Sequence, residues 1–188
     1  MNALQEAVER LRKGALIRFY SDEGWLIGCD AGNPEAAGRL LNLSTGSATP
    51  LASEVNTVAV LIGEIGLLQQ YVTHVPEIAW DLVEFAEKPL TVVYAGGRNL
   101  APALLTADGR VAIRLVKHRA SGSFLQRFGR GVAVIASPES PGAGNEISGE
   151  SKHAVDFTLD WENQATEKAQ LSTLVRLEVN GEIKFIRK

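Results

Sequence analysis

The sequence predicts an α/β fold (α+β mixed): a single domain over residues 1–188, built on one twisted, mixed sheet with flanking helices. Short β-branched and apolar runs alternate along the chain with segments of helical periodicity, which is typical of α/β folds. Near the C-terminus, Asn180-Gly181 separates two short apolar segments and indicates a β-hairpin with a type I′ turn. Because a hairpin accompanies the alternating strands and helices, we expect a mixed sheet and not a purely parallel one.

Each expected element carries a local signal. Asn2 is a helix N-cap candidate, Gly14 a stop signal, and Pro34 lies in the first helical turn, where proline is tolerated. Strands are expected at short runs of β-branched and apolar residues. The expected helices are residues 2–13, a segment opened by Asn33-Pro34, and residues 65–72, 76–86 and 121–128; the expected strands are residues 16–20, 57–62, 90–94, 111–116, 132–136, 171–179 and 183–187.

The composition narrows the functional class. The formal net charge of -3 does not indicate nucleic acid or an anionic membrane as a partner. Cys29 is the single cysteine, so no internal disulfide or cysteine-based metal site can form, and a reducing compartment is expected. No apolar run is long enough to span a bilayer and no signal-peptide pattern opens the chain. We therefore expect a cytoplasmic protein without membrane association. No metal site is expected, since the histidines lack metal-ligand spacing.

The stretch over residues 19–31 indicates a ligand-binding edge. Its sequence is Phe-Tyr-Ser-Asp-Glu-Gly-Trp-Leu-Ile-Gly-Cys-Asp-Ala. An apolar run ends at Tyr20 and is followed by Ser21-Asp22-Glu23-Gly24, which offers hydroxyl and carboxylate groups. Polar groups at the end of a buried strand are how an α/β sheet commonly presents a ligand.

Five stretches, in this order, resemble motifs of the YrdC-type family, the threonylcarbamoyl-adenylate synthases. The family signature Pro-Thr-Glu-Thr-Val-Tyr-Gly-Leu-Gly-Cys-Asp-Ala aligns without a gap with residues 20–31 and matches best at Gly28-Cys29-Asp30-Ala31. Pro-Gly-Pro-Leu-Thr, Arg-Val-Pro-x-His and Ser-Ala-Asn-x-Ser-Gly of the family resemble residues 87–91, 114–118 and 137–142. The family's final Ser-Thr-Val-Val strand, hairpin and Arg resemble residues 172–175, Asn180-Gly181 and Arg187.

The resemblance implies an enzyme that joins threonine, bicarbonate and ATP into threonylcarbamoyl-AMP with release of pyrophosphate, in the pathway of tRNA threonylcarbamoyladenosine. It implies ATP and Mg²⁺ as cofactors, and a nucleotide or double-stranded RNA as partner. It also implies ligand-binding or site-wall roles for Ser21, Thr91, Arg114, Ser137, Ser172 and Arg187. From the residues alone, a turn or strand role is as good an interpretation for most of them.

Four positions depart from the family's pattern. Thr45 and Ser47 stand where the family has a Lys-x-Arg pair, and neutral hydrogen bonds to phosphate are roughly half as strong as charge-assisted ones. Glu23 stands at the second signature threonine and Glu139 at the asparagine of Ser-Ala-Asn. One site thus loses two cations and gains two acids. We predict a degenerate active site that keeps a cleft for a nucleotide, RNA or another small ligand.

Two alternatives stay open, so the sequence does not decide whether the chain is an enzyme. The first is a working synthase whose cations come from Arg39, Lys88 or Lys117. The second is a non-enzymatic module that binds double-stranded RNA or a protein, and a basic wall could serve it. The residues of this wall would be Arg110, Arg114, Lys117, His118, Arg119, Arg127 and Arg130. Nothing in the sequence decides the oligomeric state.

Overall fold

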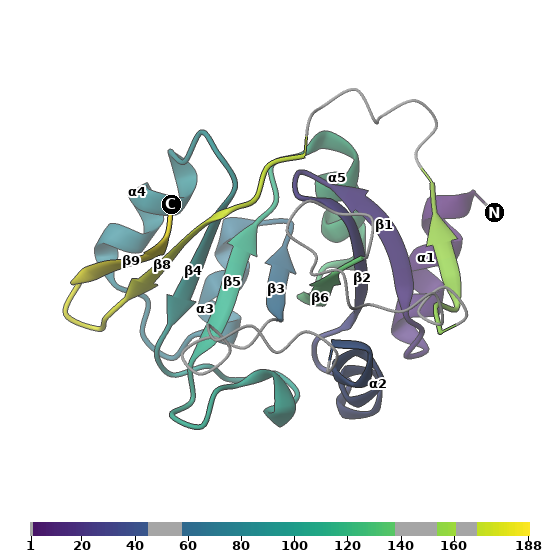
Figure 1. Cartoon of the computed structure of the whole chain (residues 1–188), viewed down its shortest axis with the longest axis horizontal. Helices are drawn as coiled ribbons and strands as arrows, with labels where there is room; N and C mark the ends of the chain where they lie inside the picture. The colour runs from purple at the N-terminus through teal and green to yellow at the C-terminus, as the bar shows by residue number, and fades with distance from the viewer. Residues whose placement is uncertain (1, 45–57, 138–153, 161–168) are drawn as a thin grey trace.

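A computed structural model describes residues 2–44, 58–137, 154–160 and 169–188. The described strands form one nine-stranded sheet in the order β7-β1-β2-β6-β3-β5-β4-β8-β9 (Figure 1). The strands are β1 (Ile17–Ser21), β2 (Gly24–Asp30), β3 (Ala59–Ile62), β4 (Leu90–Tyr94), β5 (Val111–Leu115), β6 (Val132–Ala136), β7 (Phe157–Leu159), β8 (Thr173–Leu177) and β9 (Ile183–Arg187). The helices are α1 (Ala3–Arg12), α2 (Pro34–Ser44), α3 (Leu68–Tyr71), α4 (Glu77–Glu84) and α5 (Arg119–Phe128), with 3-10 turns η2 (Ile65–Leu67) and η3 (Pro102–Leu104).

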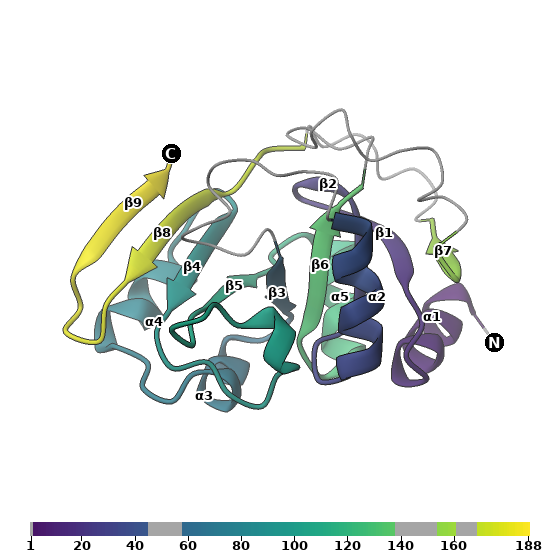
Figure 2. The same cartoon turned by 60° about the horizontal axis from the view of Figure 1, so that its bottom comes forward.

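The sheet is mixed and twisted, as the sequence predicts. β3 runs parallel to β5, β4 to β8 and β1 to β7, whereas the remaining neighbours are antiparallel. The strand direction turns steadily from β9 to β1 (Figure 2), which follows from the right-handed twist of L-peptide strands.

Helices cover both faces of the sheet. Leu40 of α2 and Val83 of α4 pack in one buried cluster with sheet residues such as Ile113. On the other face, Leu11 of α1 and Phe124 of α5 share a second cluster with β1 and β6; Figure 2 shows α2 and α5 on either side of β6. None of the described helices combines the length and apolar character that crossing a bilayer requires.

Two strands lack a clear local signal and were not expected. β2 pairs with β1 from Ile17↔Gly28 to Ser21↔Gly24, so the polar segment at residues 21–24 is a tight hairpin turn. Gly24 has φ 99°, a conformation that favours glycine and explains this residue at the turn. β7 is three residues long and, among the described strands, pairs with β1 alone, and so short an edge strand is specified by tertiary pairing.

The C-terminal hairpin forms, but the predicted type I′ turn is wrong. That turn needs positive φ at both central residues, and in the described chain only Asn99 among non-glycine residues has positive φ. Gly181 N donates to the Glu178 carbonyl at 2.9 Å, and Glu178 N to the Glu182 carbonyl at 2.9 Å. With Gly181 at φ 87°, the connection is a three-residue loop in which glycine takes the left-handed position.

Cys29 lies fully buried in β2, and burial raises the pKa of its thiol from 9.0 to about 12. Thiol reagents should therefore modify Cys29 in urea but not in the folded protein at neutral pH.

As the pH rises, the Cys29 thiol ionises first in the unfolded chain. Between pH 9.0 and about 12, the contribution of Cys29 to the free energy of unfolding therefore falls by roughly 1.4 kcal/mol per pH unit. Urea unfolding across this range should show a shallower fall for Cys29→Ala, and equal labelling of folded and unfolded protein would contradict the burial.

Candidate functional site

An arginine is buried within the sheet. Arg114 lies in β5, opposite Leu61 of β3 and Thr91 of β4 in the strand pairing. Its side chain has no exposed surface. A guanidinium that is removed from water needs compensating charge nearby, so the partners of Arg114 define what the site can bind.

The turn between β1 and β2 supplies the compensating charge. Glu23 Oε2 lies 2.6 Å from Arg114 Nη1, and Asp22 Oδ1 lies 3.3 Å from the same nitrogen. The other carboxylate oxygen of Glu23 accepts a hydrogen bond from Ser172 N at 2.5 Å, and Gln170 N donates to the Asp22 carbonyl at 3.0 Å. The segment expected to present polar groups to a ligand thus points two carboxylates at an arginine of the same chain.

Two buried hydroxyl groups extend this network. Thr91 Oγ1 and Ser172 Oγ lie 2.9 Å apart. Arg187 donates to the Ser172 carbonyl from Nε at 3.1 Å and from Nη2 at 2.9 Å. We call Glu23, Thr91, Arg114, Ser172 and Arg187 the buried arginine cluster; all five are residues that the motifs single out.

The guanidinium is charge-paired but not hydrogen-bonded. No described atom accepts a hydrogen bond from Nε or Nη2 of Arg114, and the Nη1 ion pairs lack hydrogen-bond alignment. Buried donors of this kind are commonly satisfied by ordered water or by a ligand.

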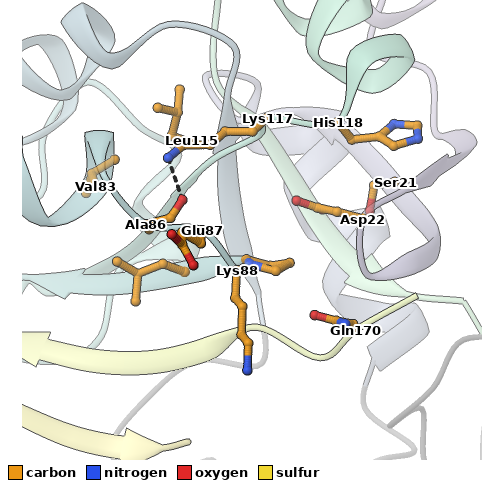
Figure 3. A pocket seen from close by; sticks show the side chains of 12 residues that line it. Ser21, Asp22, Val83, Ala86, Glu87, Lys88, Leu115, Lys117, His118 and Gln170 are labelled. Carbon is orange, nitrogen blue, oxygen red and sulfur yellow. Dashed lines mark hydrogen bonds between the residues drawn. The ribbon is translucent and has the colours of Figure 1, made fainter. Parts of the chain in front are cut away.

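A cavity of 420 Å³ opens beside the buried arginine cluster (Figure 3). Its lining residues come from the β1–β2 turn, the α4–β4 connection, the end of β5, the start of α5 and the approach to β8. They are Ser21, Asp22, Val83, Ala86, Glu87, Lys88, Pro89, Leu90, Leu115, Lys117, His118 and Gln170. Three stretches that resemble family motifs, residues 20–31, 87–91 and 114–118, therefore meet at one cavity.

Residues 9–188 match the family model described as Sua5_yciO_yrdC: Telomere recombination. The chain belongs to this family. The YrdC-type resemblance of the motifs is thereby confirmed. Comparison with curated protein sequences gives no match.

Solved structures show the same fold at low identity. E. coli YciO has a TM-score of 0.77 and 16% identity, and the match covers 98% of this chain and 88% of that one. P. abyssi Sua5 complexed with L-threonine has a TM-score of 0.74 and 20% identity over 93% of this chain and 50% of Sua5. Full-length HypF in its phosphate- and nucleotide-bound form has a TM-score of 0.72 and 15% identity over 100% of this chain and 29% of HypF. The chain thus spans about half the length of Sua5.

Within this Sua5/YciO/YrdC fold, the remaining predicted site residues differ in where they lie relative to the buried arginine cluster. Ser21 is buried in the β1–β2 turn, where its Oγ accepts from Glu23 N at 3.2 Å. Ser137 follows β6, and its Oγ accepts from Arg18 Nε at 3.4 Å, so it does not join the buried arginine cluster. Thr45, Ser47 and Glu139 lie outside the described residues, and their roles stay predictions.

Four of the seven residues of the predicted basic wall have structural partners, whereas Arg119, Arg127 and Arg130 are exposed, so the wall stays a prediction. Arg114 is buried, and Arg110 pairs with Asp108 and Glu178 across β5 and β8. Lys117 Nζ donates to the carbonyls of Glu84 at 2.6 Å and Ala86 at 2.7 Å, at the end of α4. His118 caps α5 by accepting from Ser121 N.

The residues proposed as relocated cations are also mostly engaged. Arg39 Nη2 lies 2.9 Å from Asp156 Oδ2, and Lys117 holds the end of α4. Lys88, at the cavity, has no ion-pair partner among the described residues. Of the three candidates, Lys88 alone has no partner among the described residues.

The described residues do not fit an ATP–Mg²⁺ complex well at the buried arginine cluster. The charge of Arg114 already faces two carboxylates, so it does not attract a phosphate. In the described part of the chain, no three His, Cys, Asp or Glu side chains group to hold a metal ion. Asp22, which pairs with Arg114 and lines the cavity, was missed as a site residue, although it adjoins Glu23 in the polar turn.

Proposed function

We propose that this Sua5/YciO/YrdC protein has a degenerate synthase centre and binds a small ligand in the 420 Å³ cavity. The observation that carries the proposal is the 2.6 Å pair between Glu23 and Arg114. Glu23 occupies the position of a neutral threonine in the family signature, so the chain supplies its own anion where the family pattern has none.

Adenylate formation depends on cations that neutralise phosphate charge in the transition state. Freeing Arg114 for that role means breaking a buried pair, which costs on the order of 3–5 kcal/mol. By sequence, Thr45 and Ser47 add no cation. The L-threonine bound to P. abyssi Sua5 supports a small-ligand cleft on this fold.

Pyrophosphate release tests the proposal. With ATP, Mg²⁺, threonine and bicarbonate, the protein should release pyrophosphate at least about 100-fold more slowly than an active family synthase assayed in parallel. Omitting threonine should not change its rate. A rate like that of the parallel synthase, dependent on threonine and bicarbonate, would overturn the proposal. Loss of that rate in Lys88→Met would then favour a synthase with a relocated cation.

Binding of double-stranded RNA stays a prediction of the family resemblance. Engagement of Arg110, Arg114 and Lys117 within the protein removes much of the basic surface that such binding would use. Retention on double-stranded RNA that weakens steeply with salt would support it.

A further inference from the structure

No described strand covers the outer edge of β9. In the described part of the chain, β9 pairs with β8 alone and forms the end of the sheet (Figure 2). It has five residues, Ile183–Arg187, and none of them is proline. The backbone N–H and C=O groups along its outer side can therefore pair with a further strand. β7, at the opposite edge, has only three residues, and so short an edge strand resists such pairing.

Apolar side chains gather beside the β9 edge. Ile78, Val179 and Phe185 are 44%, 54% and 57% exposed, and they are three of the five large apolar side chains that the described residues expose. Phe185 pairs with Val175, which packs in the same buried cluster as α4, so Phe185 lies on the α4 face of the sheet. The β8–β9 turn reaches the first turn of α4, since a Cβ at Gly181 would lie 3.9 Å from Ile78 Cγ2. Neighbouring exposed apolar side chains indicate a contact surface.

The two ends of β9 carry opposite charges. Glu182 precedes the strand and Lys188 follows it; both are exposed, and neither has an ion-pair partner among the described residues. Lys188 lies over the Phe185 ring, with Nζ 5.8 Å from the ring centroid. Arg187 follows a register shift in β9 and donates to the Ser172 carbonyl. Two such strands in antiparallel order bring the acidic end of each beside the basic end of the other.

Antiparallel pairing about Phe185 suits both the apolar and the charged groups. It places Phe185 of one copy against Phe185 of the other, and it brings Glu182 near Lys188 at both ends. Pairing about Lys184 would set two lysines against each other, and pairing about Ile186 would set Lys184 against Lys188. Like charges directly opposite each other destabilise a strand pair. A two-fold axis at Phe185 also closes the assembly, because each copy covers the other's β9 edge.

We propose that β9 is a self-association surface, on which two copies of this chain pair antiparallel about Phe185, with Ile78 and Val179 beside the contact. A second copy is the partner that fits, because the charges and the apolar side chain of this edge are complementary to themselves under a two-fold rotation. The inference is independent of the proposed function, since no residue of β9 lines the cavity.

Sedimentation equilibrium of the full chain tests the proposal. The protein should show a reversible monomer–dimer equilibrium with a dissociation constant of about 1–100 μM. Phe185→Asp should raise this constant at least about 10-fold, because it puts two carboxylates at the centre of the contact. Thr158→Asp, at an exposed position of the opposite edge strand β7, is the matched control and should leave it unchanged. A protein that stays monomeric at about 1 mM, or a dimer that Phe185→Asp leaves intact, would overturn the inference.

A charge exchange tests the antiparallel order. Glu182→Lys and Lys188→Glu should each weaken the dimer about 5-fold when studied alone, because like charges then meet at both ends. An equimolar mixture of the two variants should dimerise as the unsubstituted protein does, since every reversed charge then faces an opposite one. Both positions are exposed, so the fold is retained and circular dichroism checks it. If the mixture dimerises as weakly as the separate variants, the proposed pairing is wrong.

Hydrogen exchange identifies the edge that is covered. Backbone amides of residues 183–187 should exchange more slowly well above the dissociation constant than well below it, because the dimer adds strand hydrogen bonds. Amides of residues 157–159 in β7 should exchange at the same rate under both conditions. Slowing at residues 157–159 without slowing at residues 183–187 would contradict the proposal.

Discussion

Arg114→Met should lower the free energy of unfolding by about 3–5 kcal/mol in urea denaturation at neutral pH. Among the described residues, Arg114 is the one cation paired with Asp22 and Glu23, at 3.3 and 2.6 Å, and the substitution removes it. The two carboxylates would then lie close together without a counter-charge in a largely buried turn. Such a loss is far greater than that of an exposed ion pair, because water does not replace the missing partner.

Two comparisons separate this effect from a general loss of an arginine. Arg39→Met breaks the ion pair with Asp156. The Arg39 and Asp156 side chains are 43% and 37% exposed, so the free energy of unfolding should fall by no more than about 1 kcal/mol. The triple variant Arg114→Met, Asp22→Asn, Glu23→Gln removes all three charges and should recover much of the lost stability. If Arg114→Met costs no more than Arg39→Met, the charge-paired centre is wrong.

Phe124→Ala should destabilise the protein by about 3–5 kcal/mol in the same measurement. Phe124 is fully buried where α5 meets the sheet, and its ring lies edge-on to Phe19 with centroids 5.3 Å apart. The substitution opens a cavity in a close-packed core and removes an aromatic pair worth about 0.5–1.5 kcal/mol beyond its buried area.

Phe85→Ala provides the control for this prediction. Phe85 is 75% exposed at the end of α4, so its truncation should change stability by less than about 0.5 kcal/mol. Similar losses in Phe124→Ala and Phe85→Ala would show that α5 does not pack as described.

The sequence alone was sufficient for the elements whose signals are local. Asn2 caps α1, since its side-chain oxygen accepts from Gln5 N at 2.8 Å, and the β-branched run at 90–94 is β4. The order of the family motifs was also enough to predict membership in the Sua5/YciO/YrdC family. These features depend on periodicity, capping and spacing, which the linear chain carries.

Sequence reasoning failed where a residue's environment comes from distant segments. Arg114 has an apolar local context that fits either an exposed edge or a site, and only the pairing of β5 between β3 and β4 buries it. The hairpin turn type depended on strand register as well as on Asn180-Gly181. Asp22 gained importance only when the β1–β2 turn folded back onto β5.

By itself the sequence determined the α/β class, most helices and strands, the family, and the exchange of a signature threonine for Glu23. The tertiary structure decided what that exchange does. It brings Glu23, from the β1–β2 turn, within 2.6 Å of an arginine 91 positions along the chain. Charges interact through space with a strength set by distance and burial, and both quantities exist only in the folded chain.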